Sequence, residues 1–269
     1  MSQSIVIKGA TVVNRESQQV ADVKIENGFV VEVAKNLKGD LQLDASGCIV
    51  SSGFVDLHAH LREPGKEEAE TIETGSRAGA LGGYTALVAM PNTDPPQDSV
   101  AVIDFVREQG KRAGLVDVVP SGCITLGRQG ESLAPMAELS LAGVTLFTDD
   151  GNGVQDAALM RRALEYARGL GVTLAQHCEV AELTKGAVMN ECSCCTDLGL
   201  PGWPAIAEEL MVFRDIELVR ITGASMHFLH LSTKRSVELV RAAKRDGLPI
   251  TAEVTPHHLS LTQELLASY

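Results

Sequence analysis

From residue 49 onward, short apolar runs alternate with amphipathic helical stretches, and this repeat restricts the fold more than any other feature of the sequence. Helical spacing of apolar residues occurs over residues 155–169, 205–221 and 234–245. A strand–helix repeat predicts parallel strands with helices packed outside them, either as a closed barrel or as an open doubly wound sheet. The seven candidate strands are 49–58, 84–90, 116–121, 143–148, 172–177, 226–231 and 249–254.

Polar residues near the carboxyl ends of these strands distinguish between the two folds. In an open sheet such side chains would be spread along an edge, whereas in a (β/α) barrel they converge on one mouth. We therefore predict an α/β fold, a (β/α)8 TIM-type barrel, with seven of its strands visible in residues 51–269. The alternative is a barrel that closes with seven strands. The polar residues are His58, His60, Asn92, Asp149, Asp150, His177, His230, His257 and His258.

Residues 1–50 have a different pattern, with short β-type runs and no helical spacing. Asn27 and Gly28 lie between two of these runs, and Asn-Gly is the strongest short signal for a two-residue hairpin turn. So few strands would leave sheet edges exposed if they stood alone. We predict that residues 1–50 form a small sheet, which can be at most a portion of a β-sandwich because it cannot close one by itself.

Composition and charge exclude several classes of function. The chain has 269 residues, 45% of them hydrophobic, so it can bury a substantial core. Its 35 acidic residues outnumber its 23 Lys and Arg residues, and the formal net charge of -12 argues against binding to nucleic acid or to an anionic membrane. The N-terminus has no signal-peptide pattern and no apolar run has the length of a membrane span, so we expect a cytoplasmic protein.

Six cysteines without a secretory signal predict reduced thiols rather than a disulfide framework. Three of them crowd together at Cys192, Cys194 and Cys195. Cys192 and Cys195 have C-x-x-C spacing, but no second C-x-x-C or matching pair of histidines follows. We interpret this segment as a flexible loop that tolerates cysteine, in preference to a structural zinc site or a redox site.

His58 and His60 are the first two candidate metal ligands. Alternate side chains on a strand point the same way, so both imidazoles project from one face at the end of the first candidate strand. Neutral imidazole is a favoured ligand for zinc and related metals. This pair therefore predicts a metal site at the barrel mouth.

The predicted mouth holds more ligands than one metal needs. His177, His230 and one of the carboxylates Asp149 and Asp150 join the histidine pair there. One catalytic metal leaves a position open beside its protein ligands, whereas four imidazoles and a carboxylate suit two metals with the carboxylate as a bridge. Such a pair lowers the pKa of a bound water from 15.7 to about 7 and polarises a carbonyl oxygen. The predicted chemistry is metal-assisted hydrolysis of an amide, an ester or a phosphate.

The remaining histidines and one cysteine are assigned no ligand role. Cys178 directly follows a candidate ligand, but neighbours on a strand point to opposite faces, so a thiol nucleophile with its base is disfavoured. His227 is out of phase with the ligand on its strand and is interpreted as a packed or surface residue. His257 and His258 are adjacent, and both are left outside the ligand set.

Arg62 lies two residues beyond His60 and should reach the same mouth. In this acidic chain it is the best local cation for a substrate carboxylate. Asn92 could add a hydrogen bond to that carboxylate. The alternative is that Arg62 forms an ion pair with Glu63 or Asp94.

Five motifs, in this order, resemble those of the class I dihydroorotases, enzymes of pyrimidine biosynthesis in the amidohydrolase superfamily. The resemblance runs the length of the chain, and together the motifs are highly specific, although His-x-His alone is not. The motifs are DLHAHLREPG at 56–65, MPNT at 90–93, FTDDG at 147–151, HLST at 230–233 and VTPHHL at 254–259.

The resemblance implies a (β/α)8 barrel with a small β-sandwich built from both chain ends, two zinc ions, and reversible interconversion of N-carbamoyl-L-aspartate and L-dihydroorotate through a metal-bridging hydroxide. It implies that Asp150 bridges the metals, with Asp149 as the alternative. A homodimer, and aspartate transcarbamoylase as a partner, are further expectations of the same kind. The implied substrate-binding residues are His60, Arg62 and Asn92, and the implied metal ligands are His58, His60, Asp150, His177 and His230.

Two departures from the family pattern bear on function. The family's catalytic aspartate follows strand eight, where it moves a proton between the metal-bound water and the substrate nitrogen, and it would lie beyond Tyr269. We therefore expect the chain to be a fragment without that catalytic residue, inactive and poorly stable alone. The second departure is the cysteine-rich segment at 192–195, which is unusual before the family-like stretch LPGWP at 200–204.

Three other functions stay open from the sequence. A hydantoinase or dihydropyrimidinase usually bridges its metals with a carboxylated lysine after strand four, and residues 147–151 contain no lysine. A catalytically inactive dihydroorotase-like scaffold for aspartate transcarbamoylase typically lacks metal ligands, which are present here. Another metallohydrolase of the superfamily, such as a phosphoesterase or a deoxyribonuclease, would leave Arg62 and Asn92 unexplained.

Overall fold

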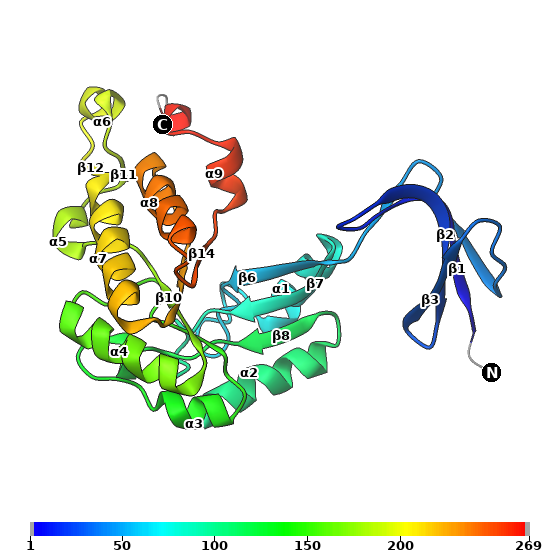
Figure 1. Ribbon diagram of the computed structural model, residues 1–269, viewed down its shortest axis with the longest axis horizontal. Helices are drawn as coiled ribbons and strands as arrows, with labels where there is room; N and C mark the ends of the chain where they lie inside the picture. The colour runs from blue at the N-terminus through cyan, green and yellow to red at the C-terminus, as the bar shows by residue number, and fades with distance from the viewer. Residues whose placement is uncertain (1–2, 267–269) are drawn as a thin grey trace. The chain divides into compact units, whose positions relative to one another are not determined.

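The computed structural model describes residues 3–266 (Figure 1). The chain divides into two compact units, with the boundary between Phe54 and Val55. Each unit has its own sheet structure, and all of the candidate metal ligands belong to the second unit.

The first unit is a five-stranded sheet of order β3-β2-β1-β4, in which β5 also pairs with β1. Asn27 (φ 53°) and Gly28 (φ 80°) form the turn between β2 and β3. Two successive residues in the left-handed region are what a tight hairpin requires, so the predicted hairpin is confirmed. The strands are β1 Ile5–Val13, β2 Gln18–Glu26, β3 Phe29–Ala34, β4 Leu41–Asp44 and β5 Ile49–Val50.

The predicted strand at 49–58 is wrong in one respect, because it is two strands in different units. β5 pairs with β1 in the first unit, whereas β6 (Phe54–Ala59) belongs to the sheet of the second unit. Two serines and a glycine, residues 51–53, separate the two strands. Such residues favour irregular backbone, which interrupts an apolar run that otherwise looks continuous.

The second unit contains all seven predicted barrel strands. They form two sheets, β6-β7-β8 and β9-β10-β13-β14, and a parallel bridge between Gly122 and Phe147 links β8 to β9. The pairs β7–β8, β9–β10, β10–β13 and β13–β14 are parallel, as the strand–helix repeat predicts. After β6, the strands are β7 Tyr84–Ala89, β8 Asp117–Pro120, β9 Leu146–Thr148, β10 Thr173–Gln176, β13 Ser225–Phe228 and β14 Ile250–Ala252.

Helices connect these strands and pack on them. Helix α1 contacts β7, α2 contacts β8, α4 contacts β10, α7 contacts β13 and α8 contacts β14. In Figure 1, α2, α4 and α7 lie on the outer side of the curved row of strands. The helices are α1 Ile72–Leu81, α2 Val100–Ala113, α3 Met136–Leu141, α4 Ala157–Leu170, α5 Ala181–Thr184, α6 Ser193–Leu198, α7 Ile206–Thr222, α8 Lys234–Arg245 and α9 Pro256–Ser260.

Helix α4 shows how the sequence pattern positions a core-facing helix. Its apolar stripe of Leu159, Ala163, Leu164 and Ala167 is buried. Asp156 caps its first turn by accepting a hydrogen bond from the Leu159 amide at 2.6 Å. The stripe predicted from spacing is therefore confirmed for this helix.

Helix α7 is different, because the predicted stripe is only partly buried. Leu210 and Phe213 are 46% and 53% exposed, whereas Ile216 is buried. The buried face instead includes Met211 and Val219. Apolar residues occur on all sides of α7, so their spacing could not determine which side faces the core.

The cysteine-rich segment also differs from expectation. Cys192 and Cys194 form a disulfide, so the prediction of six reduced thiols is wrong for this pair. The segment is not a loop but the short helix α6, which lies between two short paired strands, β11 (Met189–Asn190) and β12 (Gly202–Trp203). Cys195 is a buried free thiol beside them.

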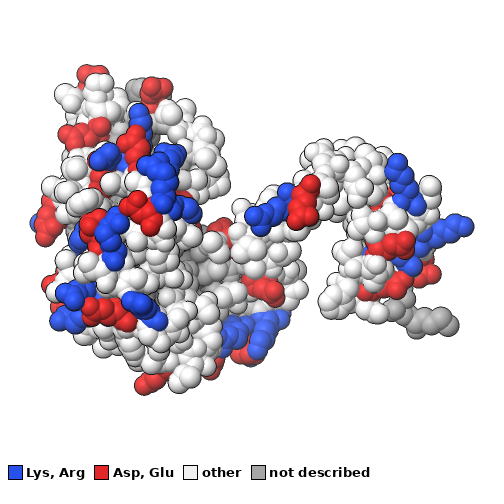
Figure 2. Space-filling view, viewed as in Figure 1, with Lys and Arg blue, Asp and Glu red and all other residues white. Residues whose placement is uncertain are grey.

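Charged side chains of both signs share the surface of the second unit. On the face shown in Figure 2, Lys and Arg lie among Asp and Glu rather than in one basic area. Several of them pair along a helix, such as Arg161 with Glu165 at 2.9 Å and Lys111 with Glu108 at 2.6 Å. Within residues 3–266, no helix combines the length and the apolar character that crossing a membrane requires.

Candidate metal centre

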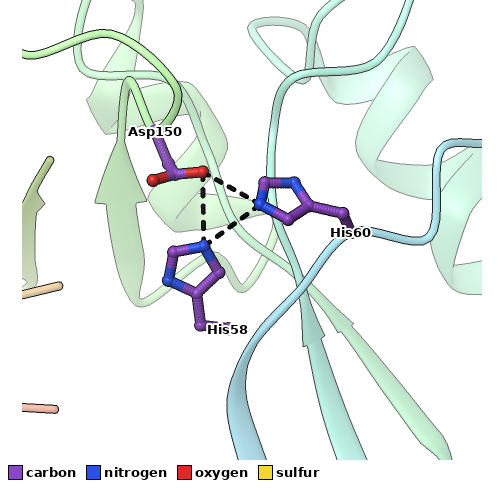
Figure 3. Close-up of side chains that lie close together, drawn as sticks. All are labelled: His58, His60 and Asp150. Atoms are coloured by element: carbon purple, nitrogen blue, oxygen red, sulfur yellow. Dashed lines mark hydrogen bonds and ion pairs between the residues drawn. The ribbon is translucent and has the colours of Figure 1, made fainter. Parts of the chain in front are cut away.

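Two groups of ligand atoms meet at the carboxylate of Asp150, which is only 2% exposed. In the first group, Nε2 of His58 and Nε2 of His60 are 3.2 Å apart, and each lies 3.3 Å from Oδ2 of Asp150 (Figure 3). In the second group, Nδ1 of His177 and Nε2 of His230 are 3.1 Å apart, and each lies 3.3 Å from Oδ1 of Asp150. The structure therefore brings together all five of the predicted metal ligands.

These side chains lie at or just beyond the carboxyl ends of strands. His58 lies in β6 and His60 just beyond it, and the Ala59 carbonyl between them accepts a hydrogen bond from the Met90 amide at 2.9 Å. His177 directly follows β10. His230 follows β13 with φ 31°, an unfavourable value for a side-chain-bearing residue. Backbone bonds of the residues on either side of His230 hold it there: the 229 amide donates to the 176 carbonyl, and the 231 amide donates to the 253 carbonyl.

The side chains of the adjacent residues Asp149 and Asp150 face different parts of the structure. Oδ1 of Asp149 accepts hydrogen bonds from the amides of Ile124 at 2.9 Å and Thr125 at 3.0 Å, and the Thr125 hydroxyl donates to Oδ2. Asp149 therefore fixes the loop after β8. Asp150 alone of the two directs its carboxylate at the histidines.

The protons of the histidine rings can be assigned from their outer partners. Where both nitrogens of a neutral ring face oxygens that only accept, the single ring proton lies in the shorter contact, which leaves a lone pair on the other nitrogen. In three rings that other nitrogen is the one that faces Asp150. The outer contacts are His58 Nδ1 with Glu253 Oε1 at 2.7 Å, His60 Nδ1 with Asn92 Oδ1 at 2.9 Å, and His177 Nε2 with Glu179 Oε2 at 2.9 Å.

This donor set fits divalent cations. Lone pairs of neutral imidazoles and two carboxylate oxygens converge from five side chains, and such atoms repel one another unless a proton or a cation lies between them. Each group supplies three ligand atoms within 4.8 Å of one another. The outer partners also orient the rings, as they do around metals in proteins generally.

Without a cation, the same site holds protons. Burial would lower the pKa of His58, but the carboxylates of Asp150 and Glu253 raise this pKa to about 9. Burial would raise the pKa of Asp150, but its hydrogen bonds with His177, His230 and His58 hold it well below the usual range. A cation that binds at neutral pH must therefore displace a proton from His58.

Arg62 and Asn92, the predicted substrate-binding residues, lie on two loops in close contact. The Asp94 amide donates to the Pro64 carbonyl at 2.9 Å. Gly65 (φ 93°) makes this approach possible, because a Cβ at this position would lie only 2.1 Å from the Asp94 carbonyl oxygen. The separation of the two loops is therefore set by a residue that has no side chain.

The side chain of Arg62 is partly buried, and its charge contributes to lowering the pKa of the neighbouring His60, after the larger effect of burial. Within residues 3–266, Arg62 forms no ion pair with a carboxylate. Glu63, one of the alternative partners, instead accepts a hydrogen bond from the Ile72 amide at 2.8 Å. The alternative of an ion pair with Glu63 or Asp94 is therefore wrong.

Two carboxylates that contact the candidate metal ligands were not predicted from the sequence. Glu253 directly follows β14, and Glu179 lies two residues after His177, so both occupy the strand ends that define the mouth. Glutamates that contact a metal ligand without contacting the metal have no sequence signature of their own. Their positions immediately after strands were the available signal.

The residues that were left out of the ligand set lie outside both groups. His227 is buried and bonded to Thr251 Oγ1 at 2.7 Å, so the packed interpretation is confirmed. Cys178 is buried, and its Sγ donates to the Gln176 carbonyl at 3.5 Å instead of facing the site. His257 and His258 lie in α9, on the exposed surface.

Two cavities flank the ligand groups. One, of about 770 Å³, is lined by His177, His230 and Trp203 among others. The other, of about 510 Å³, is lined by His58, His60 and residues after β14. A small molecule can therefore reach histidines of both ligand groups.

Comparison with known proteins identifies a family that this chain matches. The family model described as dihydro-orotase-like matches residues 47–236. The chain is 48% identical over 273 residues to a dihydroorotase of Streptomyces coelicolor, which covers 100% of this chain and 63% of that protein. It is 49% identical over 272 residues to a dihydroorotase of Mycobacterium tuberculosis, which covers 99% of this chain and 63% of that protein. The chain thus spans less than two thirds of the length of these curated relatives.

Solved structures share the fold. An L-hydantoinase (dihydropyrimidinase) from Arthrobacter aurescens superposes with a TM-score of 0.79 at 18% sequence identity, covering 97% of this chain and 60% of the other. A D-hydantoinase superposes with a TM-score of 0.73 at 25% identity, covering 98% and 60%. The predicted fold class, an α/β barrel of the TIM type, is confirmed by these likenesses.

Proposed function

Because this chain belongs to the dihydro-orotase-like family, we propose that its protein is a dihydroorotase, which interconverts N-carbamoyl-L-aspartate and L-dihydroorotate in pyrimidine synthesis in the cytoplasm. The observation that carries this proposal is the pair of ligand groups that share Asp150, with Arg62 on an adjacent loop. The reaction opens or closes a cyclic amide, so it requires an activated water and a polarised carbonyl. An anionic substrate also requires a cation at the mouth.

We propose that the two groups hold two zinc ions. His58, His60 and Asp150 would hold one, and His177, His230 and Asp150 the other, with Asp150 as the bridge. Divalent cations in such a pair lower the pKa of water from 15.7 to about 7 and polarise the carbonyl that water attacks. Imidazole and carboxylate donors suit zinc, although they also suit its neighbours in the first transition series.

The side chains of the two adjacent loops are proposed to bind the substrate carboxylate. The guanidinium of Arg62 is free of carboxylate partners within the described part of the chain and presents paired N–H donors. Asn92 already uses Oδ1 to accept from His60, which leaves its amide N–H groups to donate to substrate. His60 is thereby linked both to the proposed metal and to the substrate-binding residue.

Because this chain spans less than two thirds of its curated relatives, the test uses the protein at the full length that its gene encodes. Dihydroorotate ring opening would be followed spectrophotometrically, beside a hydantoin and dihydrouracil. We expect dihydroorotate turnover that a chelator abolishes and zinc restores. Turnover of the hydantoin without dihydroorotate would replace the proposal with a hydantoinase, and no turnover by the zinc-loaded protein would favour a scaffold.

Arg62→Met tests the substrate assignment. Charge-assisted hydrogen bonds contribute about 1.5–3 kcal/mol, so we expect kcat/KM for dihydroorotate to fall about 10- to 150-fold. Any residual turnover of dihydrouracil, which lacks the carboxylate, should be unchanged. Arg77→Met is the matched control, because Arg77 is 66% exposed on α1 and pairs with Glu73. Equal losses for both substrates would contradict the assignment.

Assembly is a separate proposal. A homodimer and an association with aspartate transcarbamoylase are the states that the resemblance predicts. Size-exclusion chromatography with light scattering, with and without that enzyme, would test both. A monomer that does not co-elute with the enzyme would contradict them without affecting the proposed reaction.

A further inference from the structure

Glu253 has a fixed position between two histidines from two other strands. Its backbone amide donates to the Phe228 carbonyl at 3.0 Å, and its carbonyl accepts from the Leu231 amide at 3.0 Å. Its side chain is 17% exposed, and its two oxygens face different rings. Oε1 lies 2.7 Å from His58 Nδ1, and Oε2 lies 3.1 Å from His227 Nε2.

These contacts determine where the ring protons lie. A carboxylate can only accept, so His227 carries a proton on Nε2. Neutral His58 carries its proton on Nδ1, because the contact with Glu253 at 2.7 Å is shorter than the contact of Nε2 with Asp150 at 3.3 Å. The remaining nitrogen of His227, Nδ1, lies 2.7 Å from Thr251 Oγ1 and accepts the hydroxyl proton. Thr251, His227, Glu253 and His58 thus form one line of hydrogen bonds in which every donor has an acceptor.

We propose that Glu253 is a positioning residue, which holds His58 in the Nδ1-protonated tautomer and directs its Nε2 lone pair at the Asp150 carboxylate. This inference rests on the proposed metal-binding role of His58. His227 and Thr251 fix the orientation of Glu253 from behind, so the buried His227 has a role in the site although it contacts no ligand group. His60 has a neutral amide, Asn92, in the corresponding place, so the two ligands of one group are supported by different chemistry.

The two contacts of Glu253 explain why a carboxylate is required at this position. A glutamine at 253 would present one acceptor and one donor, so it could not accept from both His58 Nδ1 and His227 Nε2. One of the two rings would have to change its tautomer or lose its bond. His58 has little alternative support, because the flanking Leu57 is 47% exposed.

The test compares Glu253→Gln with wild type by two measurements. Zinc affinity, measured by competition with a chromophoric chelator, should fall about 10- to 100-fold for one of two sites, the range expected on loss of an outer partner of a metal ligand. Proton-detected ¹⁵N spectra of the metal-free protein at alkaline pH should show an Nδ1–H ring for neutral His58 in wild type and an Nε2–H or mixed ring in the variant.

Two further variants separate positioning from loss of stability. Glu208→Gln removes another buried carboxylate, which accepts from the amides and hydroxyls of Ser232 and Thr233 at 2.9–3.0 Å. It should lower the unfolding temperature without changing the His58 tautomer. Thr251→Val keeps the fold and removes only the last donor in the line, so it should weaken zinc binding by no more than a few fold.

The outcomes distinguish this inference from the proposed function. If wild type carries the His58 proton on Nε2, or if Glu253→Gln leaves both zinc affinities unchanged, Glu253 does not position His58 and the inference is wrong. If wild type binds no zinc, the proposed metal centre is wrong. In that case the tautomer spectra still report whether Glu253 controls His58.

Discussion

The two halves of the candidate metal centre have the same kinds of ligand but very different surroundings. His177 and His230 follow β10 and β13, whose side chains Leu174 and Phe228 are fully buried in the larger core cluster. His58 belongs to β6, where Leu57 is 47% exposed. One half of the site is therefore built on a packed core, and the other half on a strand with a thin apolar support.

Hydrogen bonds compensate for the weaker packing on the β6 side. His58 is bonded to Glu253 and His60 to Asn92, so each ring has an outer partner from another strand or loop. On the opposite side, His177 also has a glutamate partner, Glu179, but its strand is held by the core as well. The comparison indicates that ligand geometry can be maintained by packing or by polar contacts, and each predicts a different response to mutation.

The largest loss of zinc affinity is expected at Asp150, which joins the two halves of the candidate metal centre. Asp150→Asn removes one charged ligand atom from each group, so we expect zinc affinity to fall more than about 1000-fold, about 4 kcal/mol. Both sites should weaken together if the carboxylate is shared. Isothermal titration with zinc would measure this, and a loss at only one site would show that the halves bind independently.

Asp149→Asn is the matched control for that change. It should cost about 1–3 kcal/mol of folding free energy, because Asp149 accepts from Ile124 and Thr125 in the loop after β8. Zinc affinity should stay within a few fold of wild type. A large loss of affinity here would mean that the roles of the two neighbours are not separate.

Identical leucine truncations should distinguish the packed half from the open half. Leu174→Ala in β10 empties a fully buried position and should cost about 2–5 kcal/mol. Leu57→Ala in β6 removes a side chain that is about half exposed, and less than about 1 kcal/mol is expected because little buried area is lost. Denaturant unfolding of the metal-free protein would measure both, and equal costs would contradict the contrast in packing.

The stability of the metal-free protein should also depend on pH, with the larger contribution from His58 on the open side and a further one from His177 on the packed side. The pKa of His58 is about 9 in the folded state and 6.5 when unperturbed, so the stabilisation is complete below pH 6.5 and is lost as pH rises to about 9. The pKa of His177 is raised in the same direction, with burial opposing and Asp150 and Glu179 raising it. We expect the free energy of unfolding of the metal-free protein to fall by about 1–3 kcal/mol over this interval.

Two controls accompany the pH experiment. His58→Gln should remove most of the pH dependence of the unfolding free energy, because the variant lacks the group whose pKa is raised. Saturating zinc should also flatten it, because a cation then occupies the lone pair that the proton used. A metal-free wild-type curve that rises between pH 6.5 and 9 would contradict the assignment.

Much of the site was predictable because it depends on local periodicity. The two-residue period of a strand placed His58 and His60 on one side, and the repeat of strands placed His177 and His230 at the same mouth. From the sequence, only its spacing and the family resemblance favoured Asp150 over Asp149 as the bridging ligand. The hydrogen bonds of Asp149 to the loop after β8, which give the two residues different roles, are tertiary contacts that spacing cannot reveal.

What the sequence did not predict depends on contacts between distant segments. Glu253 lies 195 residues from His58, and no local pattern relates them. The buried face of α7 is chosen by the elements around it, because Leu210 and Phe213 are as apolar as the residues that are buried. The pairing of Cys192 with Cys194 likewise depends on the turn into α6, a segment that the sequence predicts as a flexible loop.

Gly65 has a consequence for how substrate choice could evolve in this scaffold. Substitutions at Arg62 or Asn92 change the charge and hydrogen bonding of the mouth one position at a time, while the loops that carry them stay in contact. Any side chain at Gly65 would collide with Asp94 and displace both loops together. A lineage that acquires a new substrate therefore has accessible single steps through residues 62 and 92, whereas a change at residue 65 would require simultaneous compensation in the facing loop.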